Sequence, residues 1–234
     1  MRMLVVAAAL ALAGCVTPMN AADQTPAVQY LAPGRTLVAV VDERIRTEEG
    51  RPENFAGFAR NYGIPINWTV ETLMLGARED KNKTMAELLS ARLVSGLAAQ
   101  GADARGIALQ APLNDAEARA LLEREAAERL MTVQLKDWHF DLNINWVGRF
   151  QFNSDAVVTV QDSAGTVMTE QFAERAAIQA QGEESWPNMI LTAYREKMEQ
   201  ILHDAEVRAA MTAPPRELEP EGAPTEEAVP APMF

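Results

Sequence analysis

The sequence predicts an α+β fold in which a mixed, mainly antiparallel sheet carries about three helices on one face. Two observations support this prediction. Apolar and polar side chains alternate through most of residues 130–178, as in strands with one buried and one wet face. Three other segments have the apolar period of helices, and each follows a helix-capping residue. Helices that cover one face of a sheet form a two-layer sandwich.

The helices are expected at their capping signals. Thr84 and Glu87 fit a capping box, and the leucine stripe that follows ends near Gly101. A second helix is predicted after Asn114, as far as about residue 129. Ser185 caps the third, which has a proline in its first turn and an apolar face that continues to residue 205.

The strands are expected where β-branched and alternating residues gather. The run at 36–41 is apolar throughout and indicates a buried strand. A short strand at 105–110 precedes a three-stranded meander over 130–142, 146–161 and 166–178. The segment 46–80 is rich in glycine, proline and aromatic residues, with a further strand possible at 66–70. Loop packing and partner binding are both consistent with this segment.

The amino terminus indicates an exported and lipid-modified protein. An uninterrupted apolar run at 4–13 has the length of a signal peptide and is too short to span a bilayer. It closes with Leu-Ala-Gly-Cys, which resembles the lipobox of bacterial lipoproteins. The resemblance implies cleavage before Cys15 and a diacylglyceryl group on its sulfur. Acyl chains of this kind anchor a protein stably without crossing the membrane.

Four parts are therefore expected along the chain. Residues 1–14 are the signal peptide, and 15–34 hold the lipidated cysteine and a flexible tether. Residues 35–211 form a single periplasmic domain, and 212–234 form a disordered, acidic tail rich in Pro, Ala and Glu. Residue 16 is valine and not aspartate, which by resemblance to enterobacterial sorting favours the outer membrane; the inner membrane stays open.

The amino-acid composition limits the kinds of partner that the protein can bind. The formal net charge is -12, which disfavours nucleic acid as a ligand because that requires a basic surface. A single cysteine rules out a disulfide within the chain, so packing must supply the stability. We expect no cofactor, and an envelope protein as the partner.

One group of side chains that could bind a metal or act in catalysis lies on an expected strand. Asp137, His139 and Asp141 alternate and so share a face, opposite the aromatic residues Trp138 and Phe140. An imidazole between two carboxylates suits a divalent metal or a general base. The favoured interpretation is the wet side of an amphipathic strand, so no catalytic or metal residue is predicted. The sequence holds no nucleophile elbow, zinc-protease motif, Walker loop or dinucleotide fingerprint.

Several of these features together resemble one family. The lipobox, a first strand ending near Asp42 and Arg44, a helix closing at residues 97–101, the meander and the last helix are similar to the YajG-type envelope lipoproteins. The resemblance covers about residues 35–210 and rests on layout. It implies a non-catalytic envelope protein.

The predicted function is thus a lipid-anchored, non-enzymatic binding or scaffold module of the cell envelope. Two alternatives stay open. An accessory subunit of an envelope transporter predicts an apolar groove for an acyl chain. A periplasmic hydrolase built on Asp137, His139 and Asp141 predicts a concave pocket around them.

Overall fold

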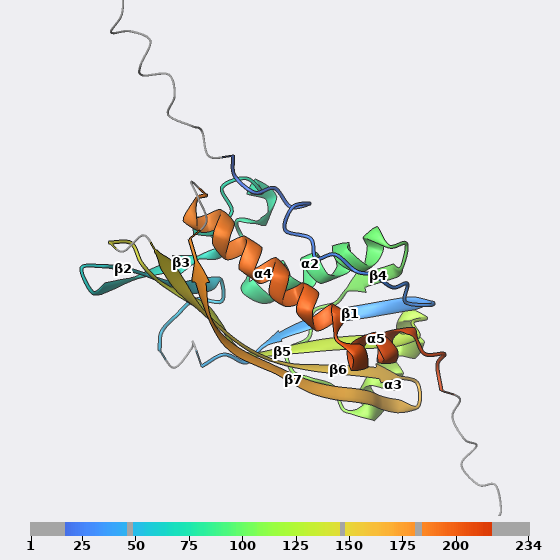
Figure 1. Cartoon of the computed structure of the whole chain (residues 1–234). Helices are drawn as coiled ribbons and strands as arrows, with labels where there is room; N and C mark the ends of the chain where they lie inside the picture. The colour runs from blue at the N-terminus through green and yellow to red at the C-terminus, as the bar shows by residue number, and fades with distance from the viewer. Residues whose placement is uncertain (1–16, 46–48, 146–147, 181–183, 217–234) are drawn as a thin grey trace, which may run out of the picture.

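A seven-stranded mixed sheet, curled around one long helix, dominates the computed structural model (Figure 1). The structure describes residues 17–45, 49–145, 148–180 and 184–216. The predicted α+β class is confirmed. The strands are β1 (Arg35–Asp42), β2 (Phe55–Asn61), β3 (Ile64–Thr69), β4 (Asp103–Gly106), β5 (Arg129–Asn143), β6 (Arg149–Asp162) and β7 (Gly165–Gln179). The helices are α1 (Val70–Leu73), α2 (Met85–Ala99), α3 (Asp115–Glu125), α4 (Trp186–His203) and α5 (Ala205–Thr212), with a 3₁₀ turn at Arg78–Asp80.

Strand β5 organises the sheet. Along one edge it pairs antiparallel with β6, which pairs in turn with β7, so the predicted meander forms. Along its other edge β5 meets two parallel strands in succession: β1 pairs with its first half and β2 with its last residues. The short β4 extends the sheet beyond β1, and β3 extends it beyond β2.

The junction between β1 and β2 on β5 is closed by one side chain. The guanidinium of Arg44 donates hydrogen bonds to the backbone carbonyl of Trp138 at 2.8 Å and to that of Phe55 at 3.0 Å. Its Nε and Nη2 both bind the carboxylate of Asp42, each at 2.9 Å. Arg44 therefore supplies donors to a stretch of β5 that neither parallel strand covers.

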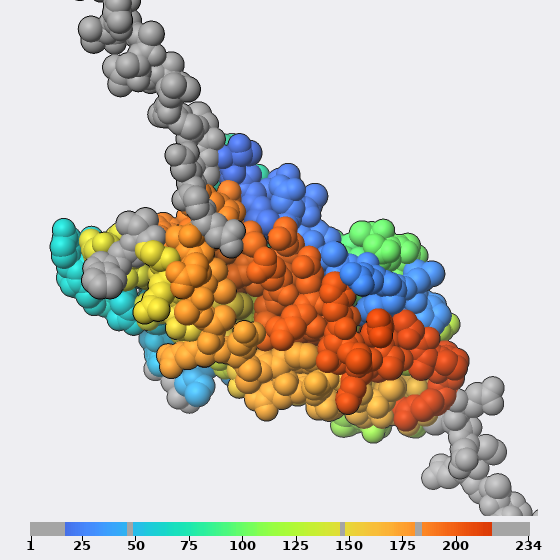
Figure 2. Space-filling view, in the orientation of Figure 1, coloured from blue at the N-terminus to red at the C-terminus, as the bar shows by residue number. Residues whose placement is uncertain are grey.

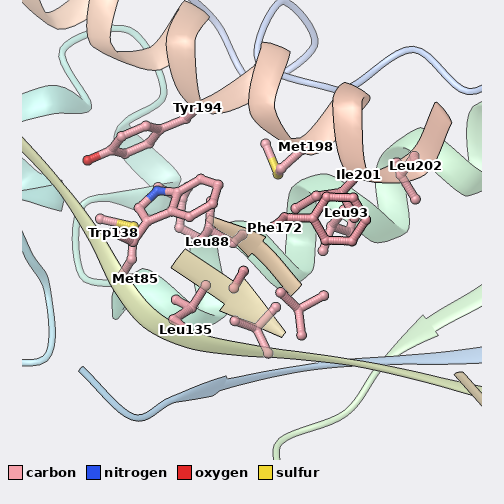
Figure 3. Close-up of a cluster of buried hydrophobic side chains, with 14 of the residues drawn as sticks. Met85, Leu88, Leu93, Leu135, Trp138, Phe172, Tyr194, Met198, Ile201 and Leu202 are labelled. Carbon is pink, nitrogen blue, oxygen red and sulfur yellow. The ribbon is translucent and has the colours of Figure 1, made fainter. Parts of the chain in front are cut away.

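The main core lies between the sheet and helices α2, α4 and α5. In Figure 3 Trp138 and Leu135 of β5 face Tyr194, Met198 and Ile201 of α4, while leucines of α2 lie beside them. Trp138 is 1% exposed, and its ring lies 5.6 Å from that of Tyr194. Each helix begins as its capping residue predicts: the boxes of α2 and α3 and the serine cap of α4 are all formed.

Helix α3 lies on the opposite face, which corrects the expectation that all helices share one face. Leu121 and Leu122 of α3 pack against Leu37 and Ala39 of β1, whereas Val38 of the same strand faces the main core. Successive residues of a strand point to opposite faces, so β1 is covered on both. This end of the molecule has three layers instead of two.

The segment 46–80 is more regular than its composition indicates. Strands β2 and β3 form a hairpin whose two-residue turn, Tyr62 and Gly63, has φ of 47° and 83°. Both values are left-handed, as in the type I′ turn that suits the twist of a hairpin. Gly57 in β2 has to be glycine because a Cβ at this position would lie 2.4 Å from the carbonyl oxygen of Phe140.

The segment expected to be a free tether is docked on the body. Residues 17–34, here called the N-terminal segment, run along α4 and α2 (Figure 2). Val28 is 3% exposed and belongs to the main core, and the side chain of Gln24 accepts hydrogen bonds from buried Arg92. The backbone N–H of Ala27 donates to Glu199 of α4. The body therefore begins well before residue 35.

The first residues of the expected tail are docked as well. Arg216 donates hydrogen bonds to both oxygens of the buried Asp162, each at 2.9 Å. The carbonyl of Ala213 accepts a hydrogen bond from Arg129. The ordered contacts thus continue to Arg216, five residues past the boundary expected at 211. The remainder of the expected tail, 217–234, lies outside the described residues.

Candidate functional site

The Asp137, His139 and Asp141 side chains share one face of β5, as the alternation predicts, but the structure divides them between two networks. Nδ1 of His139 lies 2.5 Å from a carboxylate oxygen of Asp137. Asp141 is instead held by Arg60 of β2, whose Nε and Nη2 donate to it at 2.7 and 2.6 Å. The three groups therefore do not converge on one point.

Both ring nitrogens of His139 have protein partners. With Nδ1–H donating to Asp137, Nε2 accepts from the side-chain amide of Asn153 at 3.1 Å. Asn153 is fixed in turn by Arg175 of β7, which donates to its carbonyl oxygen at 2.9 Å. Both nitrogens that a base or a metal ligand would use are thus engaged in a cross-strand network over β5, β6 and β7.

Within the described residues, no three His, Cys, Asp or Glu side chains gather so that they could hold a metal ion. The neighbouring Ser154 is 4% exposed and its hydroxyl donates to the backbone carbonyl of Glu174. Two hollows border Asp137 and His139: one of about 550 Å³ that also touches Arg175 and is widely open to solvent, and one of about 200 Å³ that also touches Arg44 and Phe55.

The aromatic residues on the other face of β5 and β6 belong to the core. Trp138, Phe140, Phe150 and Phe152 are each at most 4% exposed, so they form no open ligand platform. Trp146, the first residue of the strand expected over 146–161, lies outside the described residues.

Another hollow, of about 460 Å³, lies between α2 and the segment that follows β4. Its walls are partly apolar, with Val94 and Ile107 facing it. Carboxylates of Asp42, Glu53 and Glu87 also line it, which makes it a poor match for the acyl groove that a lipid-transport accessory requires. Sequence reasoning did not find this hollow, because its walls come from four separate segments.

Cys15 lies outside the described residues, but the chain that follows it is placed. The carbonyl of Thr17 accepts a hydrogen bond from the side chain of Asn188 at 2.9 Å, and the same side chain accepts one from the N–H of Met19 at 2.9 Å. Thr17 and Met19 are therefore both held at the first turn of α4.

None of the helices in the described part of the chain has the length and apolar character needed to span a bilayer.

Comparison with known proteins gives only distant neighbours. No protein-family model matches the chain, and no curated protein matches it. Among solved structures, the chain is similar to a Xanthomonas campestris protein of the DUF330 family model, with a TM-score of 0.43 and 11% identity over 80% of this chain and 88% of that one. It is also similar to the PelC dodecamer from Paraburkholderia phytofirmans, with a TM-score of 0.34 and 10% identity over 75% and 92% of the two chains. Lipoprotein GNA1162 from Neisseria meningitidis is similar with a TM-score of 0.31 and 9% identity over 74% and 100%. The resemblance to YajG-type lipoproteins stays a prediction.

Proposed function

We propose that the protein is a lipid-anchored lipoprotein of the cell envelope, attached through Cys15 to the periplasmic face of the outer membrane, and that it acts as a non-catalytic binding or scaffold module. The lipobox supports the anchor, and the docked N-terminal segment supports a fixed placement of the body. Because Thr17 is hydrogen-bonded to Asn188, acyl chains on Cys15 would hold the body against the membrane instead of on a long flexible linker.

The anchor is tested by intact-mass analysis of the native protein beside a Cys15→Ala variant. We expect the native chain to begin at Cys15 and to carry the mass of a diacylglyceryl group. The variant should lose that mass and leave the membrane fraction. A native protein with a free thiol at Cys15, or with residues 1–14 still attached, contradicts the proposal. Separating the two membranes on a density gradient tests the outer-membrane placement.

The non-catalytic role is supported by the network around His139, whose ring nitrogens are both occupied by side chains of the protein. His139→Gln should leave the cellular phenotype of the wild type unchanged at normal protein abundance. A loss of function in a variant that still folds and still reaches the membrane would favour a catalytic role. Crosslinking in intact cells, with Cys15→Ala as the control, tests the binding role: crosslinks to an envelope protein should depend on the anchor.

A further inference from the structure

Exposed large hydrophobic side chains gather at one end of the molecule. Seven such side chains are exposed among the described residues, and two of these, Leu31 and Ile45, lie elsewhere. The other five belong to the β2–β3 hairpin, the residues after α1 and the end of β5: Tyr62, Ile64, Ile66, Leu75 and Ile144. These five are here called the apolar end. Tyr62 is 87% exposed and Ile64 is 68% exposed, so they contribute little to the core.

The apolar end is continuous with the place where the chain leaves towards Cys15. Gly76, next to Leu75, lies against the N-terminal segment: a Cβ on it would be 2.7 Å from the carbonyl oxygen of Met19. The first turn of α4, which binds Thr17, also carries Trp186, and its ring packs 6.3 Å from that of Phe150 at the start of β6.

From Phe150 the contacts lead on to the hairpin. Phe150 pairs with Leu142 of β5, two residues before Ile144. The N–H of Ile144 donates to the carbonyl of Arg60, which pairs with Pro65 of β3. In Figure 1 the hairpin and the start of α4 lie at the same end of the molecule, far from α3.

The free edge of β3 is poorly suited to another strand. In a hairpin with a two-residue turn, Asn61 and Ile64 form the hydrogen-bonded pair that closes the turn. Ile64 and Ile66 therefore direct their N–H groups towards β2, and Pro65 faces outward. Proline has no N–H to donate, so the free edge lacks a donor at Pro65, near the turn. A second copy of the chain, or an edge strand of a partner, is thereby disfavoured as the occupant.

The net charge near the apolar end favours contact with a lipid surface more than the net charge of the whole chain does. Residues 60–83 carry four basic and three acidic side chains, whereas the chain as a whole has a net charge of -12. Repulsion from anionic headgroups is therefore weaker here than the charge of the whole chain implies. Ile64, Ile66 and Trp68 alternate on one face of β3, so the two exposed isoleucines project together.

We propose that the apolar end rests in the interfacial region of the bilayer that holds the lipid anchor, with Tyr62, Ile64, Ile66 and Ile144 in contact with lipid. This inference rests on the proposed function, since the acyl chains keep the patch next to the membrane. A tyrosine with an apolar ring and a polar hydroxyl is suited to such an interface. The contact orients the sheet, so that α3 points away from the membrane.

The test uses the full lipidated protein reconstituted in phosphatidylcholine vesicles. Acylated Cys15 has no thiol, so Tyr62→Cys introduces a single site for an environment-sensitive fluorophore. Ala120→Cys on the exposed face of α3 is the matched control, near the far end of the 14-residue strand β6. A straight strand of that length spans roughly 45 Å at about 3.3 Å per residue, which is an upper limit for the separation along this curled sheet. Lipids with a nitroxide close to the headgroup should quench the label at 62 about twofold or more and leave the label at 120 unchanged.

A second variant separates lipid contact from anchoring. Ile64→Ser combined with Ile66→Ser, in the Tyr62→Cys protein, should keep flotation with the vesicles and lose the quenching. Equal quenching at 62 and 120 in protein that floats overturns the inference and leaves the anchor standing. Self-quenching at 62 that depends on protein density, and not on nitroxide lipid, also overturns it and points to a second copy. Native protein that is found to carry no acyl chains on Cys15 overturns the proposed function itself.

Discussion

Replacing Gly96 by alanine tests whether the N-terminal segment is docked. A docked segment and a free segment predict changes of opposite sign in the free energy of unfolding. Gly96 lies in α2, where alanine is favoured over glycine by about 1 kcal/mol in helix propensity. If residues 17–34 were a free tether, the variant would gain up to that amount. In the structure, however, a Cβ at Gly96 would lie 2.7 Å from the carbonyl oxygen of Pro26 and 2.9 Å from its Cγ.

The added methyl group therefore has to move backbone that is packed in the core. Overpacking of this kind costs about 1–3 kcal/mol, which exceeds the propensity gain through most of its range. We expect Gly96→Ala to lower the free energy of unfolding by up to about 2 kcal/mol, with Val28 becoming more exposed. Urea unfolding of the chain without residues 1–14, followed by tryptophan fluorescence, measures this change.

The neighbouring Ser95 provides the matched control. It lies on the exposed face of the same helix, and Ser95→Ala should give a small gain of about 0.5 kcal/mol. A Gly96→Ala protein that is more stable than the wild type, with an unchanged dependence on urea concentration, would refute the docking of the segment.

Three further changes probe the buried charges. Asp80→Asn removes the carboxylate beside the guanidinium of Arg92, which is 5% exposed, and should cost about 3–5 kcal/mol in urea unfolding. Burial raises the pKa of Asp80 and of Asp162, but hydrogen bonds from Lys83 and Arg92 in the first case and from Arg216 in the second outweigh it and hold both pKa values below the ordinary one. Their stabilisation is therefore complete above the unfolded pKa of about 3.9 and is lost as the pH falls through the folded values, so the urea midpoint should drop in acid, and less steeply in Asp80→Asn. A midpoint independent of pH below 5 would contradict this assignment. Arg44→Lys keeps the charge but cannot serve two carbonyls and a carboxylate at once, so it should cost about 1–3 kcal/mol in the same assay; an unchanged midpoint would show that the junction does not need the guanidinium.

The sequence predicted those helices and strands that are specified by a few consecutive residues. The capping boxes at Thr84 and Asn114 place two helices because each needs only four consecutive residues. The alternation that ends at Val160 places β6, since a strand with one wet face repeats every two residues. The same alternation identified the buried aromatic face of β5 and kept Asp137 and His139 on the other.

Features that depend on distant contacts were missed. Nothing near Gln24 indicates that its amide meets Arg92, 68 residues away, so the N-terminal segment was interpreted as a tether. Strand β2 contains Gly57, a residue that favours loops, and the reason for it is the close approach of Phe140. The sequence of β1 did contain a signal for the position of α3. Every residue from 36 to 41 is apolar or buried, as expected for a strand that is covered on both faces.

The junction filled by Arg44 has a consequence for how this sheet can vary. Because β1 and β2 abut β5 end to end, the connection between Asp42 and Phe55 joins two strands that are not neighbours in the hydrogen-bonded ladder. Residues can be added to or removed from that connection without sliding either strand along β5. The half of the sheet that ends in the β2–β3 hairpin is thus free to diverge in length and surface, while the half beneath α3 keeps its pairing.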